Sequence, residues 1–303
     1  MEFFGYIRSL FLLSLPLIGG HIAQILIGVG DTLIVGRYST EALAALVLGT
    51  TIFFIIFIFG AGFSFAAMAL VSTANTEGNT LKIRRITRMA LWLSLIFGFL
   101  VSPFFVFSEK LLLLLGQELN LAVLSSEYLI YSGIAIFPAL SASVLRCYLA
   151  GMEYVKVTFY ISIIAVLLNL LINYLLVFGM FGLPELGIVG AGIATVFVNL
   201  FMLISFVIYA KIKLPQHKLF VRFWRPDRGV IGLVLKMGSA IGITNMAEAG
   251  LFSASSIMMG WVGQLELAAH GIALQLASIT FMLHLGLSDA ATIKVSSALG
   301  KTN

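Results

Sequence analysis

The sequence predicts an all-α integral membrane protein, and three observations favour that class. The 303 residues are 60% hydrophobic and only 10% charged, with a mean hydropathy of +1.09. Runs of 18 or more mostly apolar residues recur along the chain, and lysine and arginine are concentrated in alternate loops. Soluble domains carry about 25% charged residues, because polar groups must cover their surface. The solvent around this chain is therefore lipid.

Eight apolar runs are each long enough, at about 1.5 Å per residue, to cross a hydrocarbon core of roughly 30 Å. They are expected to be helices, because backbone groups in lipid need hydrogen-bond partners within their own segment. The ten-residue alternating segments of a membrane barrel are not found in the sequence. A single cysteine, Cys147, leaves no disulfide framework and indicates no metal site. The runs lie at 10–36, 45–72, 87–107, 123–147, 157–179, 189–210, 233–260 and 268–291.

The basic residues predict how the bundle is oriented. When the loops are assigned alternately to two sides, every lysine and arginine except Arg37 and Lys110 falls on the side of the N-terminus. Cytoplasmic loops carry such an excess of positive charge, so the N-terminus of this multi-pass membrane protein is predicted to be cytoplasmic. The net charge of +5 then matches anionic lipid headgroups, and no nucleic-acid partner is expected.

The longest basic loop divides the chain into two related parts. Because matching residues keep one offset through two helices and their turn, an internal repeat of six spans explains them better than chance does. The direction of the match indicates two parallel halves related by an axis along the membrane normal. An offset of 224 residues pairs Gly36 with Gly260, "LAA" at 43–45 with 267–269, Gly62 with Gly286, Ser64 with Ser288, and "VSTA" at 71–74 with "VSSA" at 295–298.

The repeat predicts three domains. Residues 1–210 form an N-lobe of six transmembrane helices, 211–232 a basic cytoplasmic linker, and 233–303 the first two helices of a C-lobe. A complete second lobe would need four more helices than the sequence contains. The chain is therefore expected to be a fragment or a truncated product.

Charged side chains at membrane depth indicate function, because each costs at least about 2.5–3.5 kcal/mol on insertion scales. Two acids are predicted to lie well inside spans, Asp31 in the first and Glu248 in the seventh. Asp289 is expected near a span end as an ordinary interfacial residue, and His21 as a packed, hydrogen-bonded histidine. Pro16 lies within the first helix, where it frees a backbone carbonyl and permits a bend.

Neutral polar residues accompany these acids. Asn169 and Asn173 lie at i and i+4 in the fifth span, on one helix face, and Thr195 lies in the sixth. Amide and hydroxyl oxygens around a carboxylate are what a hard monovalent cation or a relayed proton requires. The alternative is hydrogen bonding between helices, worth about 0.6 kcal/mol on average. The residues alone leave both interpretations open.

Enzyme classes find little support. The sequence has no HExxH metal motif, no GxSxG elbow and no phosphate loop ending in Lys-Ser or Lys-Thr. No cofactor is expected apart from a coupling ion. A buried acid in a bundle of two pseudo-repeats indicates a secondary transporter.

Three segments resemble the multidrug and toxic compound extrusion family, the MATE exporters, in its NorM-like branch. The motifs DTLIVGR and PELGIVGAGIAT are the most specific part of a resemblance that covers the whole chain. The segments are "SLPLIGGHIAQILIGVGDTLIVGRYSTEALAALVLG" (14–49), "NLLINYLLVFGMFGLPELGIVGAGIAT" (169–195) and "ELAAHGIALQLASITFMLHLGLSDAATIKVSSALG" (266–300).

The resemblance implies twelve helices in two lobes around a central cavity, and exchange of Na⁺ or H⁺ for cationic or amphipathic drugs. It implies an N-lobe cation site, possible for Na⁺, at Asp31, Asn169, Asn173 and Thr195, and a C-lobe site that includes Glu248. Family members usually act as monomers, so a monomer is expected. Proton-coupled archaeal relatives have a second acid where this chain has Asn173, so their proton relay does not carry over intact.

Two alternatives to an exporter stay open at this point. One is a flippase for lipid-linked oligosaccharides from the same wider superfamily, which ranks lower because few basic residues lie near the spans. The other is a non-transporting remnant that inserts into the membrane but cannot close a two-lobe cavity.

Overall fold

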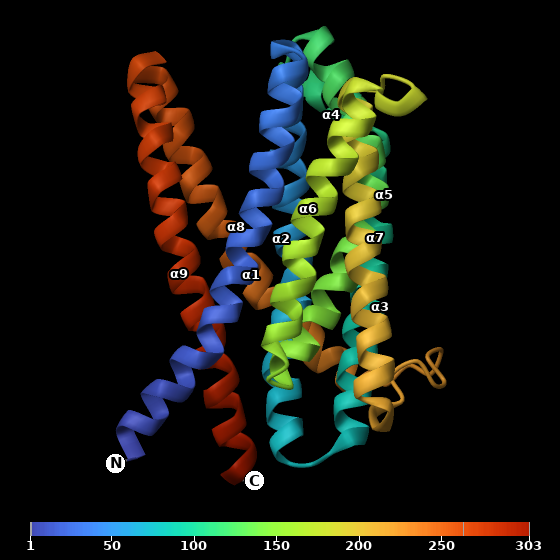
Figure 1. Ribbon diagram of the computed structural model, residues 1–303, viewed down its shortest axis with the longest axis vertical. Helices are drawn as coiled ribbons and strands as arrows, with labels where there is room; N and C mark the ends of the chain where they lie inside the picture. The colour runs from blue at the N-terminus through green and yellow to red at the C-terminus, as the bar shows by residue number, and fades with distance from the viewer. Residues whose placement is uncertain (1, 263, 303) are drawn as a thin grey trace.

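The structure is a computed structural model that describes residues 2–262 and 264–302, and helices dominate it (Figure 1). The α-helices are α1 (Glu2–Tyr38), α2 (Thr40–Thr76), α3 (Thr80–Val106), α4 (Ser108–Leu114), α5 (Leu119–Gly151), α6 (Val155–Phe178), α7 (Gly187–Lys213), α8 (Arg228–Val262) and α9 (Gln264–Thr302). Two short 3₁₀ helices are η1 (Met180–Gly182) and η2 (Pro215–His217).

The predicted class is confirmed: the chain is an all-helical, multi-pass membrane protein. Within the described residues, seven helices are long and apolar enough to cross a membrane, namely α1, α2, α3, α5, α6, α7 and α8. They coincide with the first seven predicted spans. The eighth predicted span lies inside α9, which is helical but is not among these seven. The short α4 after the third span was not predicted.

The alternation of spans places the basic segments at one end of the bundle. Both termini, the α2–α3 turn and the α7–α8 segment lie at that end, which we call the terminal end (Figure 1). The α1–α2 junction, α4, the α6–α7 loop and the α8–α9 junction lie at the opposite end. Arg37 and Lys110, the two basic residues set apart by the sequence, belong to the opposite end. Which side of the membrane the terminal end faces stays a prediction.

Helix α5 forms the centre of the bundle. Its most apolar stretch is 78% buried, against 39% or less in the other spans. Small residues make this possible, because the sequence Ala139–Leu140–Ser141–Ala142–Ser143 lets neighbouring helices approach closely. Large apolar side chains instead face outward on the surrounding helices, such as Phe99 at 73% exposure. Outward apolar faces are what a lipid solvent requires.

Helices α8 and α9 cross α2 and α1 at two glycine contacts. A methyl group added at Gly62 in α2 would lie 2.6 Å from the backbone nitrogen of Gly242 in α8. A methyl group added at Gly286 in α9 would lie 2.7 Å from the backbone nitrogen of Ile18 in α1. Both distances are shorter than a van der Waals contact, so each crossing depends on the absence of a side chain.

Hydrogen bonds join α2 to α9 nearer the terminal end. They run from α2 hydroxyls to α9 in three pairs: Ser72 to the Ile293 carbonyl (2.8 Å), Thr73 to the Ser296 carbonyl (3.1 Å), and Thr76 with Ser297 (2.9 Å). Toward the opposite end, α8 and α9 diverge from α1 (Figure 1). The two helix groups, α1–α7 and α8–α9, thus meet toward the terminal end and separate at the other (Figure 1).

The segment between α7 and α8 is bound to α3 and does not hang free. The Arg88 guanidinium donates to the carbonyls of Leu219 (3.0 Å) and Arg222 (2.9 Å). The Trp92 indole donates to the Phe223 carbonyl at 2.9 Å, and the two rings stack with centroids 5.6 Å apart. Side chains of α3 thereby donate hydrogen bonds to backbone carbonyls of the α7–α8 segment, which has few backbone partners of its own.

His217 anchors the same segment to α5. Its ring is buried, and Nδ1 lies 2.6 Å from the hydroxyl of Tyr148. Burial lowers the pKa of His217 below its ordinary value of 6.5, because the charged imidazolium loses hydration there. The docked segment therefore holds a neutral histidine.

We predict that acidification loosens this segment. The folded state binds the His217 proton less readily than the unfolded chain does, so stability is lost as the pH falls below about 6.5. Backbone amides of the α7–α8 segment should lose hydrogen-exchange protection on acidification, after correction for the intrinsic exchange rate. A His217→Gln variant should lack this step, whereas His284→Gln, at an exposed histidine, should retain it. Identical pH profiles in all three proteins would contradict the assignment.

We also predict that Gly62→Ala destabilises the bundle. The added methyl collides with the α8 backbone, and overpacking of this kind costs about 1–3 kcal/mol. Melting in detergent should therefore shift down by at least about 2 °C. Gly28→Ala is the matched control, because nothing lies within 4 Å of a methyl at that helical position. A control that melts as low as Gly62→Ala would show that the crossing is not tight.

Candidate functional site

The candidate site is a buried carboxylate between α1 and α6. Asp31 is 5% exposed, although it lies in a transmembrane helix, and Asn169 and Asn173 beside it are fully buried. Both asparagine Nδ2 groups donate to the same Asp31 oxygen, Oδ1, at 2.9 Å from Asn169 and 2.5 Å from Asn173. The predicted i, i+4 pair thus faces the predicted acid. No ion pair in the described part of the chain joins Asp31 to Arg37.

The local packing explains why α6 reaches the acid. Gly30 precedes Asp31, and a methyl group there would lie 2.6 Å from the Leu170 side chain and 3.3 Å from the Asn169 amide oxygen. Glycine at this position lets α6 lie close enough for amides on its inner face to contact the carboxylate. The helical period brings the second asparagine to the same face one turn later.

The site has more acceptors than donors. The Oδ1 atoms of Asn169 and Asn173 are buried and have no hydrogen-bond partner, and Asp31 Oδ2 receives no hydrogen bond from the described residues. A buried acceptor without a partner costs about 1–3 kcal/mol. No cluster of three His, Cys, Asp or Glu side chains occurs in the searched residues. The atoms available to a ligand at this site are the hard oxygen atoms of Asp31, Asn169 and Asn173, which suit a proton or an alkali cation.

An amide can serve this site in two ways. It carries an NH₂ donor and a carbonyl acceptor on one planar group, so a half-turn exchanges one for the other. Asn169 and Asn173 can therefore donate to a bare carboxylate and, after rotation, present oxygen to a cation beside it. The residues fit an exchangeable cation better than a permanently bound one.

Two of the predicted site residues do not join this cluster. The Thr195 hydroxyl donates to the Ala191 carbonyl of its own helix at 3.0 Å, and it is only half-buried. Glu248 lies in α8 and is exposed. The structure brings Asp31 together with both asparagines, and it leaves Thr195 in the neighbouring helix and Glu248 in another part of the bundle.

Sequence reasoning missed Tyr128 of α5. It is 2% exposed and packs in one apolar cluster with Val35, one turn from Asp31 in α1, and Ala191, one turn from Thr195 in α7. Its side chain thus lies between the two helices that carry Asp31 and Thr195. The signal available in the sequence was a tyrosine in an apolar span, since a buried phenol normally finds a polar partner.

Pro16 lies inside α1, as predicted, and α1 is bent in its N-terminal part (Figure 1). Proline removes one backbone donor and clashes with the preceding turn, which is an established cause of bends. The helix continues through the proline, so the bend changes the direction of α1 without ending it. A role for this bend in transport stays a prediction.

A second buried acid lies between α1 and α9, and here the sequence-based expectation was wrong. Asp289 is 8% exposed and is not an ordinary interfacial residue. His21 Nε2 donates to Asp289 Oδ2 at 2.8 Å, and the histidine is 5% exposed. The expectation that His21 is packed and hydrogen-bonded is confirmed. Its partner was missed because it comes from 268 residues away.

A small cavity adjoins this pair. Its volume is about 20 Å³, enough for roughly one water molecule. Arg146 and Thr158 line it together with the pair, so a basic group and a hydroxyl from α5 and α6 also face it. The contact between α1 and α9 is therefore both polar and closely packed.

Fold and site together define a polytopic α-helical membrane protein with a carboxylate–amide site inside its bundle. The sequence pattern of the MatE family matches residues 16–175 and 240–303. The chain belongs to this family, whose members are membrane transporters and not enzymes. The predicted resemblance is confirmed.

Two similar bacterial proteins carry the same description, probable multidrug resistance protein NorM. The chain is 43% identical over 302 residues to a probable multidrug resistance protein NorM of Agrobacterium fabrum (strain C58), covering 99% of this chain and 65% of that protein. It is 42% identical over 297 residues to one of Rhizobium meliloti (strain 1021), covering 97% and 64%. The chain thus spans about 65% of the length of the curated relatives it matches.

Solved structures share the fold at low sequence identity. The eukaryotic MATE transporter AtDTX14 superposes with a TM-score of 0.87 at 17% identity, over 100% of this chain and 67% of that one. A MOP superfamily transporter from Pyrococcus furiosus gives a TM-score of 0.83 at 20% identity, over 98% and 65%. These likenesses establish the fold alone.

We predict strong coupling between His21 and Asp289. Removing one partner of a buried hydrogen-bonded pair costs about 1–3 kcal/mol, because the other is left unsatisfied, whereas an apolar replacement of both costs much less. Asp289→Leu should therefore destabilise the protein strongly, and His21→Phe combined with Asp289→Leu should recover much of the loss. A double-mutant cycle on SDS-induced unfolding measures this. Strictly additive effects would mean that the pair contributes no interaction.

Proposed function

We propose that this chain belongs to a cation-coupled antiporter that exports cationic or amphipathic small molecules across the bacterial inner membrane. The observation that carries the proposal is the buried Asp31 carboxylate, flanked by two asparagines with unpartnered carbonyl oxygens. Na⁺ and H⁺ are the candidate coupling ions. The bacterial relatives named above are described as probable multidrug resistance proteins, which supports drugs as the exported class.

The chemistry of the site supports reversible cation binding. A bare carboxylate in a low-dielectric environment is costly, so it gains most from a proton or a small cation. The two amides already donate to Asp31 and have oxygen atoms available on the same groups. Binding then replaces two amide-to-carboxylate hydrogen bonds by cation–oxygen contacts, and release restores them.

We further propose that the chain comprises a six-helix N-lobe (1–210), a basic linker (211–232) and the first two helices of a C-lobe (233–303). The two glycine crossings support this. The 224-residue offset that pairs Gly62 with Gly286 also pairs Ile18 with Gly242. The contact of Gly62 with Gly242 therefore corresponds to the contact of Gly286 with Ile18. Two equivalent crossings are what a two-fold relation between halves requires.

The α2–α9 contact supports the same relation. The 224-residue offset pairs α2 with α9. A contact between these two helices therefore joins equivalent surfaces of the two proposed halves. The repeated segments "VSTA" and "VSSA" lie on these two helices and hydrogen-bond to each other, through Thr73 to the Ser296 carbonyl, for example. A surface that meets its own counterpart lies on the symmetry axis.

Closure at only one end supports transport by alternating access. Contacts between the two helix groups gather toward the terminal end, and α8 and α9 diverge from α1 at the other (Figure 1). In the proposed orientation, with the N-terminus cytoplasmic, this arrangement opens outward. A ligand shifts the equilibrium between the inward-open and outward-open conformations only by binding one of them more tightly. Cation binding would therefore drive drug export only if the cation and the drug prefer different conformations.

We predict that Na⁺ or proton binding depends on Asp31. The first experiment is ²²Na⁺ binding to the purified protein over a range of pH, with wild type beside Asp31→Asn and Glu248→Gln. Loss of binding only in Asp31→Asn would assign a sodium site to the α1–α6 cluster. Proton release on adding a drug cation, without Na⁺ binding and absent in Asp31→Asn, would assign protons.

The control is Asn199→Leu, which should leave cation binding unchanged, because among the described residues the Asn199 amide donates to the Thr195 carbonyl of its own helix and not to Asp31. Asn173→Leu, which removes one amide oxygen from the cluster, should weaken binding. Equal cation affinity and equal drug transport in wild type and Asp31→Asn would overturn the proposal.

A further inference from the structure

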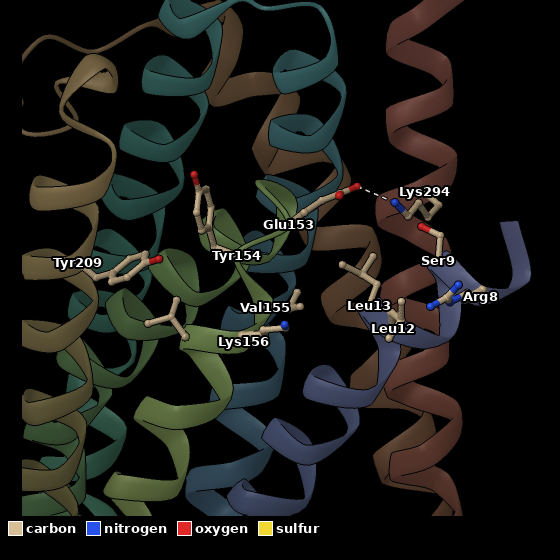
Figure 2. A pocket seen from close by; sticks show the side chains of 11 residues that line it. Arg8, Ser9, Leu12, Leu13, Glu153, Tyr154, Val155, Lys156, Tyr209 and Lys294 are labelled. Carbon is tan, nitrogen blue, oxygen red and sulfur yellow. Dashed lines mark hydrogen bonds and ion pairs between the residues drawn. The ribbon is translucent and has the colours of Figure 1, made fainter. Parts of the chain in front are cut away.

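A pocket of about 540 Å³ lies at the terminal end of the bundle, away from the Asp31 site. The N-terminal arm of α1, the α5–α6 turn, α7 and the C-terminal part of α9 enclose it (Figure 2). Nothing in the proposed transport cycle uses this pocket. Its lining is Arg8, Ser9, Leu12, Leu13, Glu153, Tyr154, Val155, Lys156, Val157, Tyr209 and Lys294.

The pocket carries an excess of positive charge. Lys294 Nζ is paired with Glu153 at 2.9 Å (Figure 2). Arg8 and Lys156 come from opposite walls, and neither forms an ion pair within the described residues. Two unpaired cations facing one space repel each other unless an anion lies between them, so the electrostatics favour an anionic ligand.

The start of α6 adds hydrogen-bond donors on the same wall. The first amides of a helix lack partners within the helix, and Tyr154, which precedes α6, provides no side-chain cap. The N-terminal end of a helix also carries partial positive charge, which favours phosphate. The pocket thus combines two free cations with uncapped amides.

The remaining surface of the pocket is amphipathic. Leu13 and Val155 form a buried apolar floor, and Leu12 is 65% exposed at the edge. Tyr154 and Tyr209 pack edge to face, with ring centroids 6.0 Å apart. Tyrosines with apolar rings and polar tips are enriched at membrane interfaces, which is where the ends of the spans place this pocket.

An apolar surface continues from the pocket along α1. It consists of exposed side chains on the lipid-facing side of that helix: Phe11 at 52%, Leu12 at 65% and Leu15 at 67%. A soluble anion gains nothing from such a surface, whereas acyl chains gain by covering it.

From this combination we propose that the pocket binds the phosphate headgroup of an anionic phospholipid, with its acyl chains lying along α1. Arg8 and Lys156 hold the phosphate from two sides, together with the first amides of α6. The lipid joins the α1 arm that precedes Pro16 to the α5–α6 turn, beside the Glu153–Lys294 pair that links this turn to α9. This site is independent of the proposed coupling ion.

Native mass spectrometry of the purified chain tests the proposal, with phosphatidylglycerol and phosphatidylcholine of identical acyl chains as probes. One phosphatidylglycerol should be retained in preference to phosphatidylcholine. Each basic residue near a membrane surface strengthens anionic lipid binding about fivefold. The Arg8→Gln, Lys156→Gln double variant should therefore bind phosphatidylglycerol at least about tenfold more weakly.

The matched control is Lys213→Gln with Arg225→Gln, which removes the same charge from exposed positions at the terminal end but outside the pocket. It should bind as wild type does. An equal loss in the control, or equal retention of the two lipids by wild type, would overturn the proposal.

A second variant separates a lipid from free phosphate. Leu12→Gln leaves the cations in place and removes apolar contact with the acyl chain, so it should weaken retention of phosphatidylglycerol. Displacement of the lipid by millimolar inorganic phosphate, with no effect of Leu12→Gln, would assign the pocket to a soluble anion and overturn the lipid proposal.

Discussion

A carboxylate inside a lipid-embedded helix bundle must be compensated, and much of this structure depends on how Asp31 meets that requirement. The amides of Asn169 and Asn173 supply donors, which requires α6 to lie against α1, and Gly30 makes that approach possible. The compensation is partial, because the amide oxygens stay without partners. A site that is incompletely satisfied by the protein alone is suited to a ligand that comes and goes.

The sequence predicted what depends on local pattern. Seven spans and the grouping of basic segments at one end follow from hydropathy and alternation. The helical period placed Asn169 and Asn173 on one face, and the family resemblance implied that this face meets Asp31. Contacts between side chains on segments far apart in the sequence could not be predicted from these local patterns. Asp289 lies near the end of its apolar run and seemed interfacial, because only the fold reveals His21 opposite it. Tyr128 was missed for the same reason: its neighbours come from other helices.

The crossings between the two helix groups combine small residues and polar contacts with apolar packing, such as Ile293 of α9 in one cluster with Leu13 and Leu17 of α1. Gly62 and Gly286 bring backbones together, and serine and threonine hydroxyls bond across α2 and α9. Such hydrogen bonds are individually weak in membranes, about 0.6 kcal/mol on average. The contacts along α2 and α9 are therefore individually weak, and the buried His21–Asp289 pair adds a polar link between α1 and α9.

The attachment of the α7–α8 segment to α3 has a mechanical consequence. Arg88 and Trp92 hold the backbone of this segment. The segment is therefore part of the α1–α7 group and is not a loose connection between that group and α8–α9. Asp227, just before α8, is itself held to α3 by Arg85 at 3.4 Å, so in the proposed transport cycle any rotation of α8 would begin at its first residues. The α8–α9 junction lies at the far end of α8 (Figure 1), so such a rotation would displace this junction most.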